Sequence, residues 1–126
     1  MMSPYVMIVD DDRDVRESLA EVLEDHGYRS VAAANGQEAL DRLRSVPNRP
    51  CLILLDLMMP VMDGRQFRAQ QREDEHLGSI PILIFSAHTN VEEASADLGA
   101  SACLRKPIEL PLLLDAVRAL CPPQPQ

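Results

Sequence analysis

Five short apolar runs alternate with five amphipathic stretches along this chain of 126 residues, and this alternation restricts the possible folds more than any other feature. Continuous runs such as Leu52 to Leu55 suit parallel strands that are covered on both faces. The stretches between the runs carry apolar residues at helical spacing. Strands that alternate with helices build repeated strand-helix units. The pattern therefore predicts an α/β fold with a doubly wound, five-stranded parallel sheet and five helices.

The same patterns predict where the elements lie. The expected strands are residues 5–9, 29–34, 51–55, 80–85 and 102–104. The first helix should run from about Arg13 to His26, with Gly27 as a left-handed stop, and the last should end at Cys121. Side chains suited to capping helix starts are Asp12, Asn35, Asp63 and Asn90.

Length and composition indicate one ordinary domain, because domains commonly hold about 100 to 150 residues. We expect residues 1–121 to form it, with no room for a second folded output domain. Residues 122–126 read Pro-Pro-Gln-Pro-Gln, which cannot continue a helix and offers little apolar surface. This tail is expected to be disordered, or to be the stub of a linker.

The formal net charge is −8, which would repel a phosphate backbone, and the basic residues form no dense cluster. Direct binding to nucleic acid is therefore not expected. No apolar stretch approaches the roughly 20 residues that a membrane span requires, and the N-terminus lacks the basic flank of a secretory signal. We expect no membrane segment and a cytoplasmic location.

The chain has three cysteines, Cys51, Cys103 and Cys121, an odd number without paired close spacing. This pattern argues against a disulfide framework and against a zinc site. We expect Cys51 and Cys103 to be reduced residues of the core.

Polar residues follow four of the five predicted strands, at the points where the strands end. They are Asp10, Asp11 and Asp12 after the first strand, Asp56 after the third, Ser86 after the fourth and Lys106 after the fifth. If the strand order is 2-1-3-4-5, the first and third strands are neighbours, and Asp10, Asp11 and Asp56 form a carboxylate cluster at the edge where open α/β sheets bind ligands. Asp12 is better suited to cap the first helix.

Clustered carboxylates repel one another unless a cation or a proton neutralises them. Mg²⁺ suits this site, because it prefers oxygen ligands and commonly binds one or two carboxylates together with phosphate oxygens. An aspartate can also attack phosphorus and form an aspartyl phosphate. The Lys106 ammonium and the Ser86 hydroxyl could then bind phosphoryl oxygens. Together these groups predict acceptance of phosphate on Asp56.

The chain resembles the receiver domain of bacterial two-component response regulators, including the single-domain chemotaxis type. The matching segments are Asp10-Asp11 after Val6 to Val9, Asp56-Leu57-Met58-Met59-Pro60-Val61-Met62-Asp63-Gly64, Ser86-Ala87 and Lys106-Pro107. The resemblance covers Tyr5 to Leu120 and implies a flavodoxin-like fold with strand order 2-1-3-4-5.

This resemblance implies a role for each site residue. Asp56 is the expected phosphoacceptor, Asp11 a direct Mg²⁺ ligand, Asp10 a carboxylate of the ion pocket, and Met58 a ligand through its backbone carbonyl. Ser86 and Lys106 would bind the phosphoryl group, and the Lys106-Pro107 bond is expected to be cis.

The resemblance also implies partners. They are a sensor histidine kinase or a histidine phosphotransfer protein as donor, and a downstream protein as target. The helix ending near Leu98, the strand at 102–104 and the last helix would form an output face that can also dimerise. Cys103 departs from the family, which usually places Tyr or Phe there, so the aromatic part of the usual switch is not expected.

Two other classes of function fit the fold. A Mg²⁺-dependent phosphohydrolase would share the aspartate nucleophile, but many such enzymes carry a second aspartate two positions later, where this chain has Met58. A phosphate-independent binding module would keep the fold without using Asp56. The predicted role is a phosphorylation-controlled signalling switch and not an enzyme, although slow self-phosphorylation and self-dephosphorylation with Mg²⁺ are expected.

Overall fold

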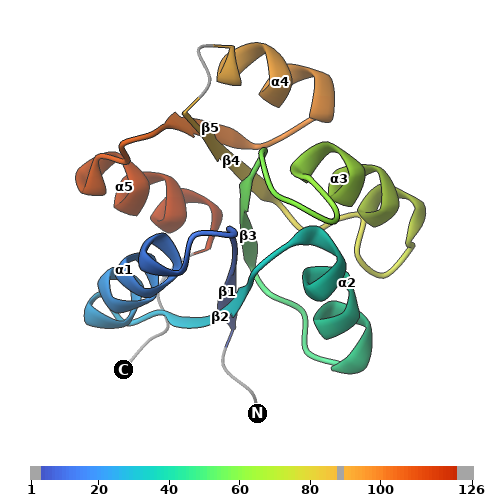
Figure 1. Ribbon diagram of the computed structural model, residues 1–126. Coiled ribbons are helices and arrows are strands. Elements are labelled where there is room, and N and C mark those ends of the chain that lie inside the picture. Colours follow the sequence, from blue (N-terminus) through green and yellow to red (C-terminus); the bar gives the residue numbers. More distant parts are fainter. Residues whose placement is uncertain (1–3, 88–89, 122–126) are drawn as a thin grey trace.

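The computed structural model describes residues 4–87 and 90–121, which form a five-stranded parallel sheet flanked by five helices (Figure 1). The strands are β1 Tyr5–Val9, β2 Arg29–Ala33, β3 Leu52–Asp56, β4 Ile82–Ser86 and β5 Ala102–Arg105. The helices are α1 Arg13–Asp25, α2 Gly36–Ser45, α3 Gly64–Glu73, α4 Val91–Leu98 and α5 Leu110–Leu120. The strand order is β2-β1-β3-β4-β5, so the predicted fold class and order are confirmed. The proposed tail at 122–126 lies outside the described residues.

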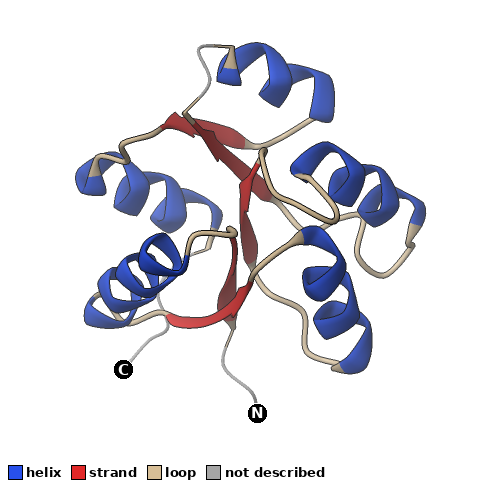
Figure 2. Cartoon of the chain, viewed as in Figure 1, coloured by secondary structure: helices blue, strands red, loops and turns tan. Residues whose placement is uncertain are grey.

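Helices cover both faces of the sheet, α1 and α5 on one side and α2, α3 and α4 on the other (Figure 2). Alternate residues of the central strands point to opposite layers: Ile53 and Leu55 join the core under α2 to α4, and Leu54 joins the core under α1 and α5. Because both faces are covered, every residue of β1, β3 and β4 is buried. This double burial explains why these strands read as unbroken apolar runs.

Three of the four predicted helix caps form. The Asp12 carboxylate accepts hydrogen bonds from the N–H groups of the first turn of α1, and Asn35 does the same for α2. Asp63 and Gln66 form a reciprocal capping box at α3. The prediction for Asn90 was wrong, because its side chain makes no capping hydrogen bond to α4.

Helix α3 contains two buried polar residues that its polar sequence did not reveal. The Arg68 guanidinium donates to the carbonyl oxygens of Leu98 and Gly99 at the end of α4, over 2.9 and 3.2 Å. The Gln71 side chain donates to the carbonyl of Leu77 and accepts from Arg68. Carbonyls at a helix end lack partners within the helix, and Arg68 supplies hydrogen bonds to two of them; Arg72 also donates to the Leu98 carbonyl.

The parallel strands all begin at one edge of the sheet, called the amino edge. This edge contains a disulfide between Cys51 and Cys121. The expectation of a reduced Cys51 was therefore wrong. The two residues are 70 positions apart, but α5 returns to the start of β3 and places their Cα atoms 5.4 Å apart. Spacing along the chain carries no signal for a pair that only the tertiary fold brings together. Cys103 is free and half-buried.

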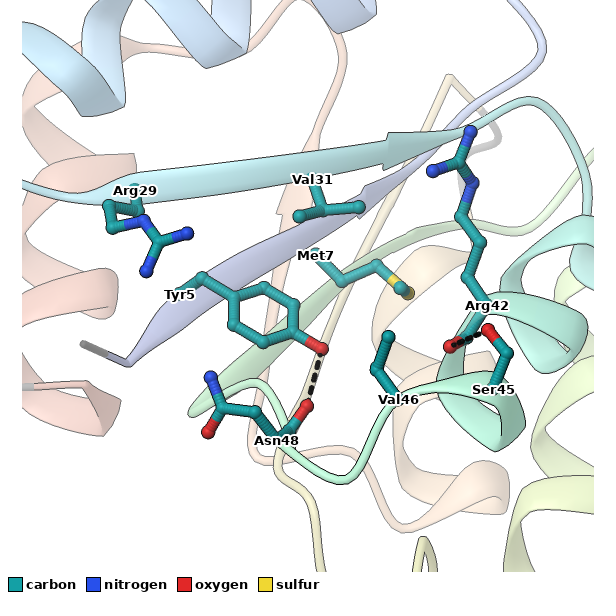
Figure 3. Close-up of a pocket in the computed structure, with 8 residues that line it drawn as sticks. All are labelled: Tyr5, Met7, Arg29, Val31, Arg42, Ser45, Val46 and Asn48. Atoms are coloured by element: carbon teal, nitrogen blue, oxygen red, sulfur yellow. Dashed lines mark hydrogen bonds between the residues drawn. The ribbon is translucent and has the colours of Figure 1, made fainter. Parts of the chain in front are cut away.

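A hollow of about 290 Å³ lies beside this edge, between the sheet and the end of α2 (Figure 3). Tyr5 forms one wall, and its hydroxyl donates a 2.9 Å hydrogen bond to the backbone carbonyl of Asn48. The Tyr5 carbonyl accepts a hydrogen bond from the Cys51 N–H. These bonds fix the segment that leads from α2 into β3. No helix within the described ranges is long and apolar enough to cross a membrane.

Candidate functional site

Four of the predicted site residues meet at the edge where the strands end, called the carboxyl edge here. Asp10 follows β1, Asp56 and Ser86 are the last residues of β3 and β4, and Lys106 follows β5. They line one open hollow of about 240 Å³. Its remaining lining residues are Asp11, Asp12, Met58 and Ala87. The parallel strands all end at this edge, which is why residues up to 96 positions apart in sequence become neighbours.

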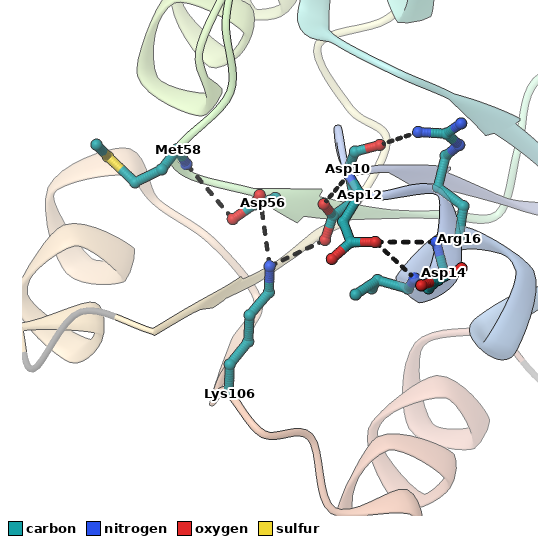
Figure 4. Close-up of polar contacts among 8 residues, drawn as sticks. Asp10, Asp12, Asp14, Arg16, Asp56, Met58 and Lys106 are labelled. Carbon is teal, nitrogen blue, oxygen red and sulfur yellow. Dashed lines mark hydrogen bonds and ion pairs between the residues drawn. The ribbon is translucent and has the colours of Figure 1, made fainter.

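Lys106 lies between two buried carboxylates, as Figure 4 shows. Its Nζ is 3.0 Å from an Asp10 oxygen and 3.5 Å from an Asp56 oxygen. Asp10 is fully buried and Asp56 is 3% exposed. The ammonium also lies 5.1 Å from the centre of the Phe85 ring, close enough for a cation-π contact. A single cation thus offsets two carboxylates that water does not solvate.

Burial raises the pKa of Asp56 from 3.8 to about 6, and the neighbouring Asp10 charge adds to this rise. The Lys106 charge and the Met58 N–H lower it, but they do not cancel the effect of burial. Burial by itself lowers the pKa of Lys106, yet the hydrogen bond to Asp10 and the charge of Asp56 outweigh burial and raise that pKa. At neutral pH the site therefore holds an ionised Asp56 and a protonated Lys106.

The acidic residues suit a divalent cation. Carboxylate oxygens of Asp10, Asp11 and Asp56 lie within 4.8 Å of one another, and Asp11 is exposed at the mouth of the hollow. Three carboxylates against one ammonium leave excess negative charge, and a hard cation with oxygen ligands such as Mg²⁺ relieves it. Met58 lines the same hollow and donates its N–H to Asp56 over 3.4 Å. Its carbonyl as a metal ligand stays a prediction.

Other residues hold the carboxylates in place, and of these the sequence patterns did not single out Arg16. Arg16 of α1 donates to the Asp10 carbonyl over 2.9 Å, which ties the loop after β1 to the helix. The Asp12 N–H donates to the Asp10 side chain. Gly64 begins α3 so close to β3 that a Cβ atom there would lie 2.7 Å from the Asp56 carbonyl oxygen. Glycine is therefore required for α3 to begin beside Asp56.

The remaining predicted features of this edge also have defined positions. Ser86 is buried and lines the same hollow as Asp56. The Lys106-Pro107 bond is cis, as expected. Val61, in the loop after Asp56, has a φ of 69° and is 80% exposed. A β-branched residue in the left-handed region is strained.

Comparison with known proteins gives consistent matches. Residues 6–118 match the family described as the response regulator receiver domain. Response regulator MprA of Mycobacterium bovis (strain BCG) is 43% identical over 121 residues, which cover 94% of this chain and 51% of the relative. MprA of Mycolicibacterium vanbaalenii matches to the same extent. The chain spans about half the length of the curated relatives it matches.

Solved structures agree with this result. The response regulator receiver protein of Pseudomonas putida has a TM-score of 0.86 and 32% identity, covering 94% of this chain and 98% of that one. Chemotaxis protein CheY4 of Vibrio cholerae has a TM-score of 0.84 and 30% identity, with coverage of 94% and 99%. The chain belongs to the response regulator receiver domain family of two-component signalling.

Proposed function

We propose that Asp56 accepts a phosphoryl group from the phosphohistidine of a sensor histidine kinase or a histidine phosphotransfer protein. The observation that carries this proposal is the placement of Lys106 between buried Asp10 and Asp56, in a hollow open to solvent. An aspartate whose pKa is about 6 is largely ionised at pH 7 and keeps an oxygen available for attack. It is also poorly solvated, which favours its reaction with phosphorus.

The chain's residues would share the work of the transfer. An Asp56 oxygen forms the new bond to phosphorus while the bond to the donor imidazole breaks. Lys106 moves its charge from the carboxylates to a phosphoryl oxygen, and Ser86 donates a hydrogen bond to another. Asp10, Asp11, Asp56 and the Met58 carbonyl would hold Mg²⁺, which neutralises phosphoryl charge when bound.

The phosphorylated chain would act as a switch that changes the binding of a downstream protein. Acceptance of phosphate redistributes the contacts of Lys106, which leads directly into α5, and of Ser86, which ends β4. Output through a partner protein, or onward transfer of the phosphoryl group, belongs to the same proposal, as does a cytoplasmic location. A homodimer through α4, β5 and α5 belongs to the same proposal.

Incubation with acetyl phosphate and Mg²⁺, followed by intact-mass measurement, tests the proposal. One labile phosphoryl adduct is expected, and Asp56→Asn should abolish it. Asp12→Asn is the matched control, because asparagine also caps helices and Asp12 lines the same hollow. This variant should keep the adduct.

The other functional classes give different results in the same experiment. Loss of the adduct in both variants, or its survival in Asp56→Asn, would contradict the proposed acceptor. No adduct from acetyl phosphate or from candidate kinases would favour a phosphate-independent binding module. Rapid turnover of many phosphoesters would favour a hydrolase.

A further inference from the structure

The Cys51–Cys121 pair lies at the amino edge, far from the hollow that contains Asp56, and no step of the proposed phosphoryl transfer uses it. Cys51 precedes β3 and is partly exposed, whereas Cys121 follows α5 and is 2% exposed. The bond joins segments 70 residues apart, across a Cα separation of 5.4 Å. Cys51 is therefore the more exposed residue of the pair, and Cys121 is shielded by the core.

This crosslink is not needed to compensate for a small core. Disulfides that are essential for folding are typical of short secreted domains with few buried residues. Here both faces of the sheet are packed, and the apolar stripe of α5 (Leu113, Leu114 and Val117) is buried against the sheet. The fold can thus persist when the bond is open.

The surroundings also suit the reduced state. The Cys51 sulfur lies 3.4 Å from the Tyr5 carbonyl oxygen, an acceptor that a thiol can use and a disulfide sulfur cannot. Cys121 lies in the core beside α1 and α5, where a free thiol behaves as a small apolar group. Neither state leaves a new polar group buried without a partner at these two residues.

We infer that Cys51 and Cys121 form a site of reversible thiol oxidation, with Cys51 as the attacking cysteine and Cys121 as the resolving cysteine. The Cys51 thiolate attacks a low-molecular-weight disulfide, forms a mixed disulfide and releases one thiol. The Cys121 thiolate then attacks the Cys51 sulfur and releases the second thiol. The protein loses two protons and two electrons, and the small disulfide is reduced to two thiols.

The oxidation state of this pair should affect the last turn of α5. The Cys121 N–H donates to the Val117 carbonyl, and this bond closes the last turn of the helix. With the disulfide formed, that turn is fixed to the start of β3. In the dithiol form only packing and this backbone hydrogen bond hold it, so the last turn should open more often.

Two measurements with glutathione disulfide and dithiothreitol test the inference in a Cys103→Ser background, which removes the third thiol. The folded Cys103→Ser protein should lose the mass of two hydrogen atoms when it is treated with the oxidant, and it should regain that mass with the reductant. Amide exchange in the last turn of α5 should be several-fold faster in the reduced form, while exchange in β3 stays unchanged. A protein that remains a dithiol in excess oxidant, or a disulfide in excess reductant under native conditions, would overturn the inference.

Single-cysteine variants test the order of attack. In the same background, Cys121→Ser should accumulate one glutathionyl adduct on Cys51, because the resolving thiol is missing. Cys51→Ser should react far more slowly, since Cys121 is shielded. Equal reaction of the two variants, or faster reaction of Cys121, would show that the assigned order is wrong. All of these readouts are independent of phosphorylation at Asp56.

Discussion

At the carboxyl edge of the sheet, Asp10, Asp56 and Lys106 are buried or half-buried charges, whereas the amino edge is held by a disulfide and by the Tyr5 hydrogen bond. The first edge contains groups whose burial costs free energy, and the second contains bonds that stabilise the fold. A chain can retain an unfavourable cluster of charges when the rest of its structure is stable enough to hold it. In this domain the stabilising bonds and the reactive residues therefore lie at opposite edges of the sheet, one strand length apart.

The largest expected effect concerns the amino edge. Reduction of Cys51–Cys121 should lower the free energy of unfolding by about 4 kcal/mol, because a crosslink over roughly 70 residues restricts the unfolded chain. Urea unfolding of the oxidised and reduced forms measures this change, and Cys103→Ser should leave the difference intact. If the two forms are equally stable, the disulfide at the amino edge does not stabilise the fold.

The second effect is a pH dependence at the carboxyl edge. The folded-state pKa of Asp56 is about 6, above its ordinary value of 3.8, so the folded state binds more protons between these values. Stability should therefore fall as pH rises from about 4 to about 6, by on the order of 3 kcal/mol from this residue. In urea unfolding without Mg²⁺, the advantage of Asp56→Asn over the unmodified chain should grow across this window and then level off. An advantage that is constant with pH would contradict the raised pKa.

A smaller loss is expected from Lys106→Met. Asp10 and Asp56 would then lack their shared cation, and the free energy of unfolding at pH 8 without Mg²⁺ should fall by about 2 kcal/mol. The carboxyl pKa of Asp56 should rise further, as NMR titration of its side-chain carbon can measure. Arg105→Met is the neighbouring control, since Arg105 pairs with Glu92 at the exposed surface and should contribute less than about 1 kcal/mol. Equal losses in the two variants would show that Lys106 does not offset buried charge.

The smallest effect concerns backbone strain beside the site. Val61→Asn should stabilise the protein by roughly 0.5 to 1 kcal/mol, because asparagine tolerates the left-handed φ of 69° better than valine. Val46→Asn is the control, since Val46 is also an exposed valine but has an extended backbone with a φ of −125°. Thermal unfolding of both variants should separate relief of strain from the general effect of replacing valine. A gain of the same size at both positions would exclude strain as its cause.

The sequence predicts most of the carboxyl edge and little of the amino edge, for a physical reason. Parallel strands appear in the sequence as apolar runs, and the residues that follow these runs all lie at one edge of the sheet. The sequence alone therefore groups Asp10, Asp56, Ser86 and Lys106. The strand order follows from the family resemblance. The residues after the strands and the segments that carry the resemblance are both short stretches of sequence, and each has a fixed place in the fold.

Contacts between distant segments have no such local pattern. The disulfide depends on α5 ending beside the start of β3, which the spacing of Cys51 and Cys121 does not encode. The sequence patterns did not single out Arg68 either, because its partners are backbone carbonyls at the end of another helix. The sequence therefore did not identify the disulfide or the side chain that bonds to the backbone of a remote helix.

Chemical identification of the phosphorylated residue tests the central claim most directly. After incubation with acetyl phosphate and Mg²⁺, reduction of the acyl phosphate with borohydride and peptide mapping would mark the modified aspartate as homoserine. Conversion at Asp56 alone is expected. Conversion at Asp10, Asp11 or Asp63, or no conversion under conditions that phosphorylate another receiver domain, would contradict it.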